Sequence, residues 1–132
     1  MPSKKTPIEK FMVPTPETVG QEQSLAFAAK KMEEHGFRHL PVLHGGALVG
    51  VISERDVNMV SGLPEIDPEA LTVEDAMTPD PYAVTPGTML GEVVAAMIEH
   101  KYGCAVISDG AKVHGIVTTT DMLRILAQEL TE

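Results

Sequence analysis

The sequence predicts an α+β protein made of two similar halves, each with the order strand, helix, strand, strand, helix. Three repeated features support this fold class. The segment GVISERD at residues 50–56 recurs as GIVTTTD at residues 115–121, an offset of 65 residues (115 − 50 = 121 − 56). The Met-x-Pro-x-Pro pattern that starts at Met12 recurs at Met77 with the same offset. The apolar stripe of a helix near residues 25–32 recurs near residues 90–97.

Each half opens with a short helical turn and an extended stretch. Residues 6–9 (TPIE) have the pattern of a capping box with proline at the first helical position, and residues 72–75 (TVED) begin a similar turn. Proline fixes φ and biases the preceding residue toward extended conformations. We therefore expect short edge strands at residues 15–19 and 80–84.

A helix, a hairpin and a second helix follow in each half. Apolar residues at i, i+3, i+4 and i+7 predict two helices, which end at His35 and near His100. Gly-Gly and Asp-Gly pairs are hairpin signals. They predict turns between strands at residues 40–43 and 47–53, and between strands at residues 104–107 and 112–118. Each closing helix begins beside the repeated aspartate, which should lie at or near the N-cap, and the second of them, at residues 122–130, is the longer.

The repeats divide the chain into residues 6–62 and 72–130, joined by an acidic, proline-containing connector at residues 63–71. Neither half can cover both faces of its own sheet. We therefore expect the halves to pack sheet against sheet about a pseudo-two-fold axis, with the helices outside.

Composition excludes several functions for the 132-residue chain. A net charge of −9 argues against a nucleic-acid-binding face and against attraction to anionic membranes. No apolar run is long enough to span a membrane, and the first residues lack the apolar core of a signal peptide. The single cysteine, Cys104, rules out an internal disulfide and favours a cytoplasmic location. The 5 histidines show no metal-ligand spacing, and no catalytic constellation is recognisable.

The element order, the duplication, the Met-x-Pro-x-Pro entry and the Gly-x-x-Ser/Thr-x-x-Asp exit together resemble the CBS domain family. The chain from about Thr6 to Leu130 resembles one tandem CBS pair, a Bateman module. The resemblance implies a regulatory module. Such a module would bind an adenosine compound (AMP, ADP, ATP or S-adenosylmethionine) and signal to a partner protein. The alternative is a scaffold that has lost its ligand and acts only by dimerising or docking. An enzyme, the third possibility, is disfavoured because no catalytic constellation is present, and we expect no cofactor.

The resemblance also implies two clefts, each built from the exit motif of one repeat and the entry segment and first long strand of the other. The exit aspartate would bind the ribose diol, and the residue before it and the hydroxyl three before it would bind phosphate. One cleft would use Thr118, Thr120 and Asp121 with Val13, Pro16, Thr18, Phe37 and Arg38. The other would use Ser53, Arg55 and Asp56 with Thr78, Pro81, Ala83, Lys101 and Tyr102.

The two clefts are not equivalent in sequence. Val13 stands where Thr78 offers a hydroxyl, and Arg55 and Lys101 give the Asp56 cleft the more cations. We therefore expect the Asp56 cleft to take ADP or ATP, and the Asp121 cleft to take AMP, a less charged adenosine compound, or nothing. Helix capping alone would also explain both aspartates, and the two roles are compatible because a carboxylate has several acceptor sites.

A second apolar stripe on the helices predicts a homodimer, because one layer of helices cannot bury two stripes within so small a chain. The stripe comprises Gly91, Ala95 and Ile98 on one helix and Met122, Ile125 and Leu126 on another.

Overall fold

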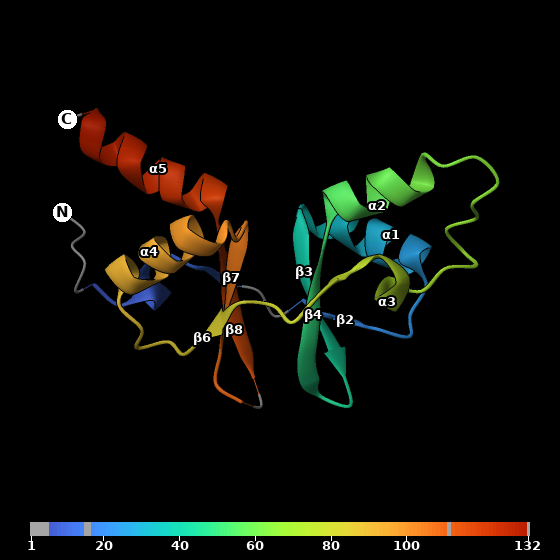
Figure 1. The fold of residues 1–132 in the computed structure, drawn as a ribbon, viewed down its shortest axis with the longest axis horizontal. Helices are drawn as coiled ribbons and strands as arrows, with labels where there is room; N and C mark the ends of the chain where they lie inside the picture. The colour runs from blue at the N-terminus through green and yellow to red at the C-terminus, as the bar shows by residue number, and fades with distance from the viewer. Residues whose placement is uncertain (1–5, 15–16, 111, 132) are drawn as a thin grey trace. The chain divides into compact units, whose positions relative to one another are not determined.

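The computed structural model describes residues 6–14, 17–110 and 112–131. Within these ranges the chain forms two four-stranded sheets and five α-helices, which confirms the predicted α+β class. The chain divides into two compact units (Figure 1). Unit 2 contains residues 17–81, and unit 1 contains the described residues of 1–16 and 82–132.

Unit 2 is built on a sheet with the strand order β2-β3-β4-β5. Strands β2 and β3 are parallel and connected through α1, whereas β3 and β4 form an antiparallel hairpin. Its elements are β2 (Val19–Gly20), α1 (Leu25–His35), β3 (His39–His44), β4 (Ala47–Ser53), α2 (Glu54–Ser61), α3 (Val73–Ala76) and β5 (Thr78–Pro79).

Unit 1 repeats this arrangement with the strand order β1-β8-β7-β6. Strands β6 and β7 are parallel, and β7 and β8 form the hairpin. Its elements are the 3-10 turn η1 (Ile8–Lys10), β1 (Val13–Pro14), β6 (Ala83–Val84), α4 (Leu90–His100), β7 (Cys104–Ser108), β8 (Val113–Thr118) and α5 (Thr119–Leu130). The two helices that end at a histidine and both hairpins agree with the sequence prediction.

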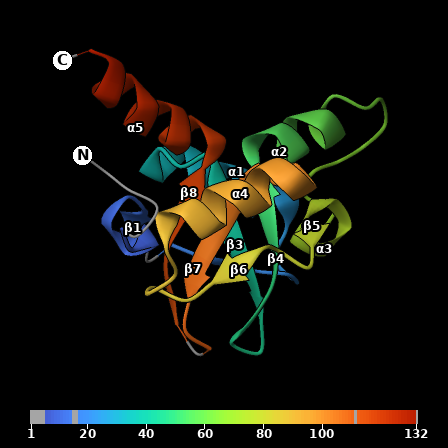
Figure 2. The same ribbon diagram turned by 60° about the vertical axis from the view of Figure 1, so that its left-hand side comes forward.

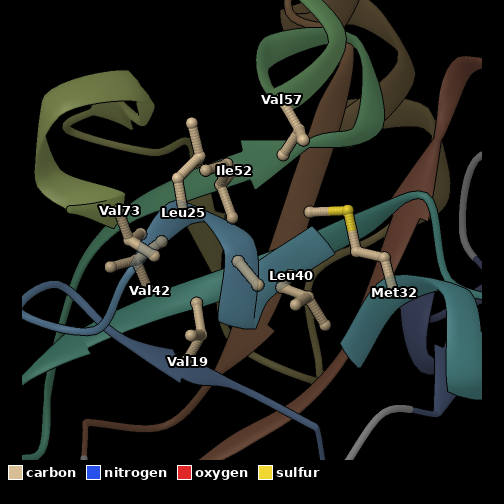
Figure 3. Close-up of a cluster of buried hydrophobic side chains, with 9 residues drawn as sticks. Val19, Leu25, Met32, Leu40, Val42, Ile52, Val57 and Val73 are labelled. Atoms are coloured by element: carbon tan, nitrogen blue, oxygen red, sulfur yellow. The ribbon is translucent and has the colours of Figure 1, made fainter. Parts of the chain in front are cut away.

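Each unit has its own hydrophobic core between its helices and one face of its sheet. In unit 2, Leu25 from α1, Leu40 from β3 and Ile52 from β4 are fully buried and converge there (Figure 3). In unit 1, Val93 from α4 and Val117 from β8 take the corresponding places. The opposite face of the sheet is also apolar, as Pro41 and Val51 show in unit 2. The predicted sheet-against-sheet packing of the two halves stays a prediction.

The entry turn of each sequence repeat packs on the first helix of the other repeat. In unit 1, the Ile8 amide donates to the Thr88 carbonyl (2.7 Å) and the Leu90 amide donates to the Thr6 carbonyl (2.7 Å). In unit 2 the same pair of bonds joins Val73 to Gln23 and Leu25 to Leu71, each at 2.8 Å. The compact units therefore differ from the sequence repeats, because the repeats exchange their entry segments.

This exchange corrects the prediction of one edge strand per entry segment. Each segment contributes two strands of two residues, and the two belong to different sheets: β1 and β2 in the first repeat, β5 and β6 in the second. All four lie at sheet edges, as predicted. Pro14 and Pro79 have no N–H to donate, and an edge strand tolerates this because one of its sides is unpaired. Residues 15 and 16 lie outside the described part of the chain.

The predicted capping box at Thr6 is also wrong. Pro7 rather than Thr6 occupies the N-cap of the turn, and the proline side chain has no group that could cap it. The Ile8 amide donates to the Thr88 carbonyl. The second turn does carry a capping box, formed by Thr72 and Asp75.

The closing helices differ in length, as predicted. Helix α2 has 8 residues and α5 has 12, and the far end of α5 extends away from the sheet of its unit (Figure 2). No helix in the described ranges combines the length and apolar character needed to cross a membrane.

Candidate functional site at the two exit motifs

The exit motif of unit 1 forms the junction between β8 and α5. The helix begins at Thr119, so Thr118 is the N-cap and Asp121 is the third helical residue. Asp121 therefore lies near the N-cap, as predicted, and Thr118 is the capping residue itself. The Asp121 Oδ2 atom accepts from the Thr118 amide (2.8 Å) and from the Thr118 hydroxyl (3.0 Å), while the Asp121 amide donates back to that hydroxyl (3.2 Å). This is a capping box, which fixes the carboxylate rigidly at the helix start.

The exit motif of unit 2 has the same geometry. Ser53 is the N-cap of α2, its amide donates to the Asp56 Oδ2 atom (2.9 Å), and its hydroxyl accepts from the Asp56 amide (3.1 Å). In both units the capping box uses Oδ2 of the aspartate. Capping is therefore observed, and it does not use Oδ1 of either aspartate.

The amide of the residue before each aspartate is open. The first helical amide donates to a loop carbonyl, from Thr119 to Gly103 (3.1 Å) in unit 1 and from Glu54 to Arg38 (2.8 Å) in unit 2. The third amide is taken by the capping box. Within the described residues, the second amide, that of Thr120 or Arg55, has no hydrogen-bond partner. An open N–H at a helix N-terminus is a binding position for an anion.

Arg124 was missed by the sequence analysis. Its guanidinium Nη1 atom lies 2.7 Å from Asp121 Oδ1 and forms an ion pair across less than one helical turn. The Asp121 side chain is only 8% exposed, whereas that of Arg124 is 60% exposed. The i, i+3 spacing of opposite charges on a predicted helix was the signal that could have revealed this pair.

The other predicted residues of unit 1 lie on β1, β6 and the loop after α4. Val13 is half-exposed on β1 and pairs with Ile116 of β8, and Ala83 is exposed on β6. Lys101 ends α4 in a left-handed conformation (φ 58°). Tyr102 stacks on Tyr82 with the ring centroids 4.8 Å apart. Burial raises the pKa of Tyr82, and the nearby Glu92 carboxylate raises it further.

The remaining predicted residues lie in unit 2. Phe37 stacks on His35 (centroids 6.2 Å apart), and the Arg38 carbonyl contacts the first amide of α2. Thr18 precedes β2, Thr78 lies on β5, and Pro81 follows it. Pro16 lies outside the described residues.

The exit-motif residues of each predicted cleft are thus brought together within one unit: Thr118, Thr120 and Asp121 in unit 1, and Ser53, Arg55 and Asp56 in unit 2. Each predicted cleft also draws residues from the other unit. The combination of both sets into one cleft stays a prediction.

Two helices of unit 1 border an apolar groove of about 410 Å³. Val94 and Ile98 of α4 and Met122 of α5 line it, and Lys101 and Tyr102 lie at its end. Ile98 is 74% exposed, so a large part of this groove is uncovered apolar surface.

Comparison with known proteins identifies the repeats. The family model of the CBS domain matches twice, at residues 8–61 and 73–128. The chain belongs to the CBS domain family. Its two exit motifs lie near the ends of the two matched segments, so Asp56 and Asp121 are equivalent positions of two CBS domains.

Known CBS proteins resemble this CBS pair over most of its length. Inosine-5′-monophosphate dehydrogenase of Korarchaeum cryptofilum is 34% identical over 115 residues, which are 86% of this chain and 23% of the dehydrogenase. The chain therefore spans about a quarter of that relative. The crystal structure of CBSX2 in complex with AMP matches with a TM-score of 0.77 and 25% identity, covering 93% of this chain and 97% of CBSX2.

A second solved structure is the CBS domain pair of protein MJ0100 in complex with 5′-methylthioadenosine and S-adenosyl-L-methionine. It matches with a TM-score of 0.78 and 25% identity, and the match covers 92% of this chain and 99% of that one.

Proposed function

We propose that this CBS pair is a regulatory module that binds adenosine-containing ligands at its exit motifs and signals their presence to a partner protein. One observation carries the proposal. In both units the closing helix begins with an open second amide beside an aspartate whose Oδ2 caps the helix. A ribose diol offers two hydroxyl donors to the carboxylate, and a phosphate accepts from the amide. The AMP complex of CBSX2 and the adenosyl ligands of MJ0100 support this ligand class.

The first test is calorimetry with AMP, ADP, ATP and S-adenosylmethionine. Asp121→Asn and Asp56→Asn each keep the size of the side chain but remove the charged acceptor for the diol. We expect each to weaken binding at its own site by about 1.5–3 kcal/mol, or about 10- to 150-fold, because hydrogen bonds to charged groups have this strength.

Asp75 provides the matched control. Its Oδ2 accepts from the Thr72 amide (2.9 Å) and the Thr72 hydroxyl (3.1 Å) in a capping box like those of the exit motifs. Asp75 itself belongs to the entry turn α3 and not to an exit motif. Asp75→Asn should change folding stability about as much as the other two substitutions and leave ligand affinity unchanged. Equal ligand affinities in all three variants and the wild type would mean that Asp56 and Asp121 only cap their helices.

A scaffold without a ligand is the second candidate, and exposed apolar side chains on the helices of unit 1 favour it. Ile98, Leu123, Leu126 and Leu130 are 52–75% exposed. This function predicts that no adenosine compound raises the melting temperature. A ligand at ~100 times its dissociation constant would add about 2.7 kcal/mol of stability.

Under either function we propose a homodimer that covers the α4–α5 surface, defined by Ile98, Met122 and Leu126. Light scattering at micromolar concentration should give twice the chain mass of 14.2 kDa. Ile98→Glu would place a charge in the buried interface and should shift the particle to the monomer mass. A wild-type particle of 14.2 kDa would contradict the dimer. The regulated partner and the cytoplasmic location stay predictions from the sequence.

A further inference from the structure

The two exit aspartates differ in how their free oxygen is used. Asp121 Oδ1 is paired with Arg124 at 2.7 Å. The position equivalent to Arg124 in the first repeat is Met59 (124 − 65), which has no charge. Among the described residues no cation forms an ion pair with Asp56. One exit motif therefore holds its aspartate with an arginine and the other does not.

The Arg124 pair controls access to Asp121. Both lone pairs of Oδ2 are taken by the amide and hydroxyl of Thr118, so a ribose diol must bind at Oδ1. The Asp121 side chain is only 8% exposed, and the Arg124 guanidinium is bonded to its Oδ1 atom. A diol that binds there must share Oδ1 with Arg124 or displace it. Displacement alone replaces a charge-assisted bond with a weaker neutral donor.

An anionic group on the ligand can offset the cost of displacing Arg124 from Asp121. Arg124 is 60% exposed and has five N–H donors, of which one is bonded to Asp121. A phosphate at the open Thr120 amide would lie at the same helix start, four positions before Arg124. The guanidinium can then turn from Asp121 to the phosphate and keep a charged partner. Unphosphorylated adenosine offers no such partner.

We infer that Arg124 makes the Asp121 site select phosphorylated over unphosphorylated adenosine compounds, by holding Asp121 in the free protein and pairing with phosphate in the complex. The inference rests on the proposed function and adds a specificity residue to it. It also gives the Asp121 site a cation within unit 1, whereas the sequence analysis had assigned that site only Arg38. At the Asp56 site Arg55 is exposed and forms no ion pair within the described part of the chain, so we expect no exchange of an ion pair there.

The test compares AMP with adenosine at a single site. Asp56→Asn is introduced first to weaken binding at the other site. Calorimetry then measures both ligands with and without Arg124→Met, which copies the residue of the first repeat. We expect AMP to bind about tenfold more weakly in the Met variant, while adenosine binds equally well or better. The AMP-to-adenosine affinity ratio should therefore fall at least about tenfold, and AMP affinity should lose much of its salt dependence.

Two further variants make the result specific. Lys30→Met removes an exposed cation on α1, at an ion pair with Glu34, and should leave the ratio unchanged. Met59→Arg in an Asp121→Asn protein places an arginine opposite Asp56 and should raise the ratio at that site. Circular dichroism melting confirms that each variant is folded.

The outcomes separate the inference from the proposed function. An unchanged AMP-to-adenosine affinity ratio in Arg124→Met overturns the inference and leaves the proposed ligand binding intact. The same holds if both ligands lose affinity equally, which would mean that Arg124 only positions Asp121. Failure of the wild type and of every variant to bind either ligand overturns both. A lower ratio in Arg124→Met with a higher ratio in Met59→Arg supports the inference.

Discussion

Leu40→Ala is expected to lower the free energy of unfolding of unit 2 by about 2–5 kcal/mol. Leu40 is fully buried on β3, among side chains from α1 and the neighbouring strands (Figure 3). Truncation removes buried apolar surface and leaves a cavity that the β-sheet cannot close by moving, so both terms destabilise the fold. Urea denaturation followed by circular dichroism measures the loss.

Leu63→Ala is the control for this substitution. Leu63 is 52% exposed and follows α2, so the same chemical change there should alter the free energy of unfolding by no more than about 0.5 kcal/mol. A loss below 1 kcal/mol for Leu40→Ala would mean that the unit 2 core is not packed as described. Because the chain forms two compact units, the unfolding transition should be fitted with one step and with two.

Gly115→Ala is expected to destabilise unit 1 by about 1–3 kcal/mol and to release the entry segment. A Cβ atom on Gly115 would lie 2.7 Å from the Val13 carbonyl oxygen and 2.8 Å from the Met12 sulfur. The thioether can move, but the carbonyl belongs to β1, which pairs with β8 at this point. The added methyl group must therefore push β1 away from the sheet edge. Hydrogen exchange of residues 8–14, measured by mass spectrometry, should rise.

Two glycines test this interpretation. Gly50 is the equivalent position in unit 2, where a Cβ atom would lie 2.8 Å from the Thr78 carbonyl oxygen, so Gly50→Ala should release β5 in the same way. A Cβ atom on Gly87 would meet no atom within 4 Å, and Gly87→Ala should be close to neutral. If Gly115→Ala had the stability and the hydrogen exchange of the wild type, the close approach of β1 to Gly115 would be contradicted.

The repeated pattern explains why much of the fold could be predicted. Helix ends at His35 and His100 follow from local signals: an apolar stripe of helical period that stops where Gly36 or Lys101 takes a left-handed conformation. The hairpins follow from turn residues at Gly45 and Gly110, both with positive φ. In each case residues close in sequence determine the structure.

The candidate site was only partly predictable, for the same reason. The exit aspartates and their hydroxyls are neighbours in sequence, so the Thr118–Asp121 and Ser53–Asp56 pairs could be recognised as motifs. Their role as third helical residues depends on where the helix starts. That start is shifted toward the strand because the Gly103 and Arg38 carbonyls bind the first amide of each helix. The Arg124 pair depends on the Asp121 oxygen that the cap leaves free.

The sequence by itself determined the duplication, the helices, the hairpins and the identity of the exit motifs, because these depend on spacing and local propensity. Only the tertiary structure decided that the repeats exchange their entry segments. The entry strand β1 has only two residues and includes Pro14, which has no N–H, so its partner is chosen by contacts distant in sequence. Those contacts are two hydrogen bonds to the start of the first helix of the other repeat and a close approach to Gly115 or Gly50, where a side chain would push the entry strand away.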